Sequence, residues 1–103
     1  MTRIVVLFNL KSDTDREAYE AWARSTDLPT VRALPSVDGF TVHPVNALLG
    51  SDAAPPYEYV EIIDVADMDQ FGRDIASETM QRIAGEFQAF TDNPVFMLTG
   101  SLD

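Results

Sequence analysis

The residues best suited to acid–base chemistry in this sequence are one histidine and two carboxylates. His43 is the single histidine and lies in the strand-like pattern F-T-V-H-P-V, while Glu61 lies in a second such pattern, Y-E-Y-V-E-I-I-D-V. An imidazole beside a carboxylate can act as a general base, because the carboxylate stabilises the protonated ring. Pairing of the two strands would therefore create a catalytic site in which His43 moves a proton and Glu61 supports its basicity.

Strand parity decides which of these side chains share a face of the sheet. In the second pattern we assign Val60 and Ile62 to the core face, which leaves Tyr59 and Glu61 on the opposite face. If the apolar residues before His43 also face the core, His43 lies opposite Tyr59 or Glu61 of an antiparallel partner. The alternative is a half-exposed histidine on an edge strand without a catalytic role.

A second group of candidate residues precedes these strands. Tyr19 and Trp22 fall on a predicted helix and, with Tyr59, offer flat apolar surfaces for an aromatic substrate, while Asn9 offers a neutral hydrogen-bonding group. A tryptophan on a helix is more often a core residue than a substrate-stacking one. Asp27 either caps the short helix that follows or places its carboxylate at the mouth of a pocket. In a pocket it would stabilise positive charge as it develops on a substrate.

Hydrophobic periodicity predicts the elements that must position these residues. We expect a capping box from Thr14 to Glu17, a helix start at Asp67, and an edge strand containing Pro44, which lacks a ladder donor. The order βαββαβ is the ferredoxin-like arrangement, an α+β fold with a four-stranded antiparallel sheet and helices on one face. The predicted strands cover residues 3–10, 40–45, 57–65 and 95–99, and the helical segments cover residues 14–27, 30–34 and 67–90.

The other face of such a sheet is uncovered by helices, and its expected side chains are too apolar to remain in water. We therefore predict a homodimer joined through these faces. The residues assigned to the uncovered face are Val5, Leu7, Val45, Tyr57, Tyr59, Ile63, Val95 and Met97.

Composition narrows the class of protein. A chain of 103 residues with 46% hydrophobic residues predicts a single domain over residues 1–103. The absence of cysteine excludes disulfides and thiolate ligands. The sequence also lacks a histidine pair that could bind a metal and a glycine-rich loop that could bind a phosphate cofactor. We therefore expect no metal and no other cofactor. A net charge of −10 disfavours nucleic acid as a partner. No apolar run approaches the roughly 20 residues of a membrane span, so we expect a cytoplasmic protein without a membrane partner.

Four segments together carry a resemblance to a known family. They read Y-E-A-W, D-L-P-T-V-R-A-L-P-S-V, Y-E-Y-V-E and F-T-D-N-P-V-F, at residues 19–22, 27–37, 57–61 and 90–96. In combination they resemble the RedY-like (HapK-like) family, within the dimeric α/β-barrel proteins. The resemblance implies a bacterial pathway to prodiginine or related pyrrole and indole pigments or alkaloids, with cyclisation or condensation roles. More distantly, the sequence is similar to EthD-like proteins, some of which have a histidine where this chain has Asp27.

Three functions fit these observations, and whether the chain is an enzyme at all is left open among them. The first is a cofactor-independent cyclase or condensing enzyme for a pyrrole or indole intermediate, with His43, Glu61 and Asp27 as its acid–base groups. The second is a cofactor-free monooxygenase of the same architecture. The third is a non-catalytic protein that binds a small aromatic molecule or a partner enzyme of the pathway.

Overall fold

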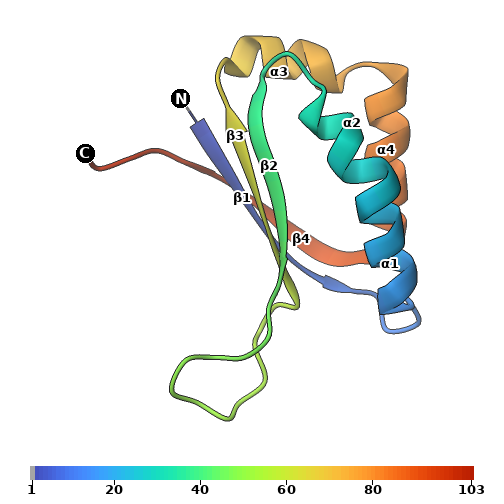
Figure 1. Ribbon diagram of the computed structural model, residues 1–103, viewed down its shortest axis with the longest axis vertical. Coiled ribbons are helices and arrows are strands. Elements are labelled where there is room, and N and C mark those ends of the chain that lie inside the picture. The colour runs from blue at the N-terminus through green and yellow to red at the C-terminus, as the bar shows by residue number, and fades with distance from the viewer. Residues whose placement is uncertain (1) are drawn as a thin grey trace.

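Residues 2–103, the part of the chain described by the computed structural model, form one antiparallel sheet with helices on one face (Figure 1). The strand order is β2-β3-β1-β4, and every neighbouring pair is antiparallel. The predicted α+β, ferredoxin-like arrangement is therefore confirmed. The elements are β1 (Thr2–Leu10), α1 (Arg16–Trp22), the π-helical segment η1 (Ala23–Asp27), α2 (Leu28–Arg32), β2 (Val37–Pro44), β3 (Tyr59–Val65), α3 (Met68–Ile75), α4 (Glu78–Phe90) and β4 (Thr91–Thr99).

The core lies between the sheet and the helices and is centred on Phe8 of β1, which is fully buried. Its ring stacks on Tyr59 of β3 with centroids 5.3 Å apart. Tyr19 of α1 and Phe87 of α4 pack edge-on against the same ring at 5.7 and 5.0 Å. Offset and edge-on aromatic pairs add to the free energy gained from burial alone. This aromatic cluster joins the central strands to both helical regions.

The face of β3 that the sequence predicts to point away from the helices points toward them instead. The register pairs Phe8 with Tyr59, so Tyr59 and Glu61 are buried beneath the helices. Val60 and Ile62 are only half-buried, on the opposite face. The prediction that these two residues face the core is wrong, because both faces of β3 carry apolar side chains and only the pairing with β1 selects between them.

Helix starts were predicted at the right places but not always at the right residue. α1 is capped by Asp15, whose carboxylate accepts a hydrogen bond of 3.1 Å from the backbone N–H of Glu17. Thr14 instead donates to the backbone carbonyl of Phe90 at 3.4 Å, so the capping box is wrong. Asp67 caps α3 as predicted.

The sheet edges follow the sequence more closely. β2 is an edge strand, as predicted, and it covers Val37–Pro44 rather than the predicted residues 40–45. β4 begins at Thr91, earlier than expected, and Asn93 takes a φ of 48° where the pairing with β1 shifts register. Within residues 2–103, none of the helices has the length and apolar character needed to cross a membrane.

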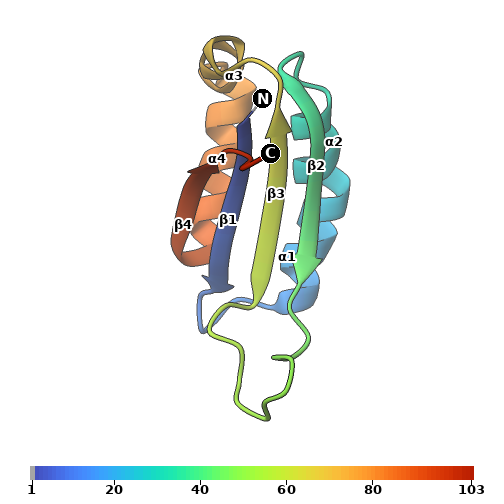
Figure 2. The same ribbon diagram turned by 90° about the vertical axis from the view of Figure 1, so that its left-hand side faces the viewer.

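The uncovered side of the sheet, seen face-on in Figure 2, carries two cross-strand rows of apolar side chains. Tyr59 and Ile63, which we had placed there, point to the helices instead. Val95 and Met97 keep 40% and 39% of their surface exposed. We call this surface the outer face and define it by Val5, Ile62 and Met97 in one row and Leu7, Val60 and Val95 in the other.

The position of Phe8 predicts a large effect on stability. Phe8→Ala should lower the free energy of unfolding by about 3–5 kcal/mol, because it removes a fully buried ring and leaves a cavity. Leu102→Ala, at a fully exposed position, is the control and should change it by less than about 0.5 kcal/mol. Urea unfolding measures both values. Similar values for the two variants would contradict the assignment of Phe8 to the centre of the core.

Candidate functional site

A cavity of about 300 Å³ lies between the sheet and the helices. Its wall is apolar except for three polar side chains, Asp27, Glu61 and Gln81. A small number of polar groups in a mainly apolar wall is typical of small-molecule sites. We call it the inner cavity, and its remaining lining residues are Ile4, Val31, Phe40, Ile63, Phe71, Ile75, Met80, Ile83, Ala84, Phe87 and Phe96.

Asp27 reaches the cavity because of the helix segment that carries it. Tyr19, Ala23, Asp27 and Val31 recur every fourth residue, and all are buried. In a regular α-helix of 3.6 residues per turn, each such step turns about 40° beyond a full turn, so the row would drift around the helix. The π-helical segment η1 has more residues per turn and offsets this drift. Asp27 makes no capping hydrogen bond with its side chain, so its alternative explanation as a helix cap does not hold.

Glu61 enters the cavity from β3, on the face that also buries Tyr59. Only 4% of Glu61 is exposed, and its Oε2 atom has no hydrogen-bond partner. An ionised carboxylate without a partner is strongly disfavoured in an apolar environment. Glu61 is therefore a buried carboxyl group whose free oxygen is available to a ligand.

The environment of Asp27 and Glu61 favours the protonated form of both carboxyls. Burial raises the pKa of Asp27 to about 7. Burial, and then the neighbouring charge of Asp27, raise the pKa of Glu61 well above its ordinary value. Near neutral pH the pair can therefore hold a protonated carboxyl and a carboxylate in one cavity, which is the requirement for acid and base catalysis at one site.

Tyr19 does not line the inner cavity, but it lies close enough to Asp27 and Glu61 for their charges to act on it. Burial raises the pKa of its hydroxyl first, and the charges of Glu61 and Asp27 raise it further. Its hydroxyl is buried without a hydrogen-bond partner. The phenol therefore keeps its proton and is available as a hydrogen-bond donor.

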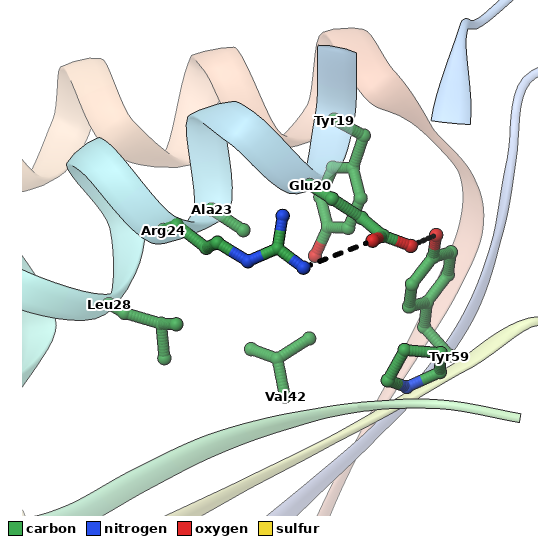
Figure 3. Close-up of a pocket in the computed structure, with 8 residues that line it drawn as sticks. Tyr19, Glu20, Ala23, Arg24, Leu28, Val42 and Tyr59 are labelled. Carbon is green, nitrogen blue, oxygen red and sulfur yellow. Dashed lines mark hydrogen bonds and ion pairs between the residues drawn. The ribbon is translucent and has the colours of Figure 1, made fainter. Parts of the chain in front are cut away.

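Tyr19 lines a separate, smaller pocket of about 80 Å³ (Figure 3). In this side pocket Glu20 accepts a hydrogen bond of 2.7 Å from the Tyr59 hydroxyl and pairs with Arg24 at 3.4 Å. The predicted stacking role places Tyr19 and Tyr59 against substrate, but Tyr59 is fully buried against Phe8. The side pocket is lined by Tyr19, Glu20, Ala23, Arg24, Leu28, Val42, Pro44 and Tyr59.

His43 does not join the two carboxyls. It pairs with Val60, so its ring lies on the outer face, and its Nε2 atom lies 2.9 Å from the hydroxyl of Thr41. The predicted contact between His43 and Glu61 or Tyr59 is therefore wrong. The physical reason is the reversal of β3, because a shift of one residue in pairing moves a side chain to the other face.

Two predicted substrate-binding residues serve other contacts. Trp22 donates to Glu86 of α4 through Nε1 at 2.8 Å and packs on Tyr19, and it lines neither the inner cavity nor the side pocket. Asn9 lies outside both as well, and its side chain donates to the carbonyl of Pro56 and accepts from the N–H of Glu58. Trp22 therefore connects α1 to α4, and Asn9 connects β1 to the segment before β3.

Four aromatic residues line the inner cavity that the sequence analysis did not assign to a site. Phe71 and Phe87 fall on apolar stripes of the second helical region, and Phe40 and Phe96 are strand residues. A helical stripe predicts burial but cannot distinguish core from cavity wall. Across the described part of the chain, the structure contains no group of three or more His, Asp or Glu side chains placed to bind a metal ion.

Comparison with known families places the chain. The model of the family described as REDY-like protein HapK matches residues 2–102. The chain belongs to this family. The match spans nearly the whole sequence, and it confirms the resemblance carried by the four segments. No curated protein sequence matches the chain.

Solved structures agree with the family and the fold. HapK from Hahella chejuensis superimposes with a TM-score of 0.78 at 28% identity, covering 99% of this chain and 93% of HapK. SnoaB from Streptomyces nogalater, described as a cofactor-independent oxygenase, gives 0.76 at 18% identity, covering 99% and 93%. A dimeric ferredoxin-like protein of unknown function from Thermobifida fusca gives 0.71 at 18% identity, covering 97% and 90%. The last two likenesses concern the fold.

Asp27 predicts a specific dependence of stability on pH. Its pKa is raised from 3.8 to about 7 by folding, so as pH rises the unfolded chain releases this proton first and the folded state loses stability. Asp27→Asn removes this loss. Its free energy of unfolding, relative to wild type, should rise by up to about 4 kcal/mol between about pH 4 and about pH 8 and then level off.

Urea unfolding across this pH range measures the difference between variant and wild type. Asp52→Asn is the matched control, because it removes the same charge from an exposed position in the loop between β2 and β3. Its difference from wild type should stay nearly constant. A constant difference for Asp27→Asn as well would show that Asp27 is not desolvated in the folded protein.

Proposed function

We propose that this protein is a cofactor-independent tailoring enzyme of secondary metabolism that closes or joins rings of a pyrrole or indole intermediate by acid–base catalysis. Membership of the REDY-like HapK family supports the metabolic setting. The observation that carries the proposal is the meeting of Asp27 and Glu61 in the apolar inner cavity, with one oxygen of Glu61 unpartnered. A cytoplasmic location is part of the same proposal.

The two carboxyls have different roles in ring formation. As an electron-rich ring carbon attacks a carbonyl carbon, protonated Glu61 donates its proton to the carbonyl oxygen. Asp27, as the carboxylate, stabilises the cationic ring and then accepts the proton from the ring carbon that made the attack, which restores aromaticity. Asp27 then gives this proton to the new hydroxyl group, which leaves as water. The Glu61 carboxylate accepts the ring N–H proton of the cation that remains, so both carboxyls return to their starting protonation states. General acid–base help of this kind contributes ~10²–10⁴-fold per group.

The apolar wall supports this chemistry in two ways. The rings of Phe40, Phe71, Phe87 and Phe96 offer surfaces for an aromatic substrate, and aromatic pairs favour offset or edge-on contact. Exclusion of water lowers the local dielectric, so the charge on Asp27 acts more strongly on a developing cation. A volume of about 300 Å³ lies at the lower end of the range for small-molecule pockets, roughly 300–1,000 Å³.

A cofactor-free monooxygenase is the second candidate, because SnoaB shares the fold and is described as a cofactor-independent oxygenase. In that reaction Asp27 would deprotonate the substrate, and the resulting anion would react with oxygen. Turnover in the absence of oxygen separates the two, since ring closure proceeds and oxygenation stops. A third candidate, a non-catalytic carrier of the aromatic intermediate, would bind substrate without accelerating any reaction.

The catalytic assignment predicts the effect of isosteric substitutions. Glu61→Gln and Asp27→Asn should each lower kcat by ~10²–10⁴-fold, because each removes one proton-transfer group, with a smaller change in substrate affinity. The substrate for the assay is the compound that accumulates when the gene is deleted from its host. Wild-type activity in both variants would overturn the acid–base mechanism, and an inactive wild type would favour the carrier.

His43→Ala tests the competing site on the outer face. Because the His43 ring lies on the other side of the sheet from Glu61, we expect its turnover to stay within severalfold of wild type. A loss as large as that of Glu61→Gln would move the base to the outer face. Substrate binding measured in parallel separates a catalytic from a structural effect.

We also propose that two copies of the chain associate through their outer faces, which would form a dimeric α/β barrel. The two apolar rows of the outer face are half-buried or exposed in one chain, with no helix over them (Figure 1). Burial of such rows against a second copy would remove them from water. The fold relative from Thermobifida fusca is described as dimeric.

The dimer proposal predicts the effect of a charge on the outer face. Ile62→Glu should yield a monomer at micromolar concentration in light scattering, because it places a carboxylate in the middle of the proposed interface. Leu49→Glu, at a fully exposed loop position, adds the same charge elsewhere and should leave the dimer intact. A wild-type protein that is already monomeric would contradict the proposal.

A further inference from the structure

The inner cavity has an unbalanced charge. Its three polar side chains are two carboxyls and the amide of Gln81, and no Lys, Arg or His side chain lines it. The carboxyls are each only 4% exposed, so water reaches them poorly. A buried charge is normally paired with an opposite charge or neutralised by a proton, and the lining provides no cation.

The arginines of the helical elements around the cavity are engaged elsewhere, and those of α3 and α4, Arg73 and Arg82, contact Gln70 at 2.8 Å and Glu86 at 3.8 Å. Arg24 of η1 pairs with Glu20 at 3.4 Å. Arg32 of α2 donates to the backbone carbonyl of Phe40 at 2.9 Å. Arg16 of α1 pairs with the same Glu20 at 3.3 Å. None of these arginines lines the cavity, so they do not compensate the acid pair there.

The groups that face the pair from the surrounding elements are uncharged. α1 contributes the Tyr19 hydroxyl, and α4 contributes Gln81, an exposed residue whose amide donates to the backbone carbonyl of Ala76 at 3.3 Å. The lining side chains of β1, β2 and α3 are apolar, and include Ile4, Phe40 and Phe71. Farther away, Glu20 and Tyr59 act on Tyr19. Glu61 therefore keeps a free acceptor oxygen in a site without a positive charge.

We infer that the inner cavity binds its ligand as a cation, an apolar aromatic molecule with a protonated nitrogen, and that Asp27 and Glu61 are its counter-ion. The inference rests on the proposed function for the location of the ligand, and it adds the charge of the ligand. A protonated nitrogen supplies the N–H donors that the free Glu61 oxygen lacks and the positive charge that the lining lacks. Carboxylate and phosphate ligands are excluded, because the acid pair repels them.

Cation binding must be coupled to proton release. The free pair holds protons near neutral pH, since burial raises the pKa of Asp27 to about 7 and that of Glu61 well above its ordinary value. When an already protonated amine enters, the pair loses a proton to solvent. Affinity for the amine should therefore rise as pH rises, by at most about tenfold per pH unit when one proton is released. A neutral ligand of the same shape should show no such rise.

The test compares two isosteric probes by calorimetry between about pH 5 and about pH 8, a range chosen around the titration of the pair. Tetrahydroisoquinoline is protonated throughout this range, and isochroman carries an ether oxygen in place of the nitrogen. In wild type we expect the amine to gain affinity with pH and to bind more tightly than isochroman at the upper end. Buffers of different ionisation enthalpy report the released proton directly.

Variants assign the effect to the pair. Asp27→Asn and Glu61→Gln should each weaken amine binding at least tenfold at the upper pH while leaving isochroman binding in place, which also shows that the cavity is intact. Asp52→Asn, with the same change in net charge at an exposed position, should behave as wild type. Equal affinity for the two probes, unchanged amine binding in both pair variants, or no binding of either probe would overturn the inference.

The outcome is separable from that of the proposed function. A protein that binds the amine as described but turns over no intermediate retains the cation site and loses the catalytic role. Conversely, loss of turnover in Glu61→Gln without a pH-dependent preference for the amine retains the catalytic role and rejects the cationic ligand.

Discussion

The register between β1 and β3 is the constraint on which both the fold and the site depend. It places Phe8 beside Tyr59 and so turns Tyr59, Glu61 and the rest of that face toward the helices. A slip of one residue would reverse every side chain of β3. It would expose Tyr59, which now contacts the rings of Phe8 and Tyr19. The aromatic core therefore determines that a carboxyl two residues along the strand is buried as well.

Burial of Glu61 and Asp27 together is unfavourable for the fold and raises the pKa of both carboxyls. Desolvation opposes ionisation of both groups, so their protons are held at a pH where surface carboxyls have lost theirs. Above the pKa of Asp27, the folded state is therefore less stable than it would be with a neutral residue at position 27. Sites that sacrifice stability in this way are typical of functional positions. The same desolvation makes each carboxyl a stronger partner for a cation.

The two faces of the sheet consequently differ in their physical roles. The helix-facing side combines the aromatic core with a cavity that contains acid groups, whereas the outer face carries neutral apolar rows with His43 and Thr41 beside them. The proposed chemistry between sheet and helices and the proposed self-association through the outer face therefore depend on different residues.

The sequence by itself determined the elements, their order and the candidate carboxyls. Alternation in β1, the apolar stripe of α4 and the proline that ends β2 are local patterns, and local patterns suffice for an antiparallel sheet of this topology. Residue type was enough to single out Asp27 and Glu61. Tertiary structure decided that the two carboxyls share one cavity, because this depends on a strand register and on the rotation of a π-helical segment. The same register removed His43 from the site. Whether an apolar stripe fills a core or borders a cavity depends on the volume between packed elements, and sequence periodicity contains no information on that volume.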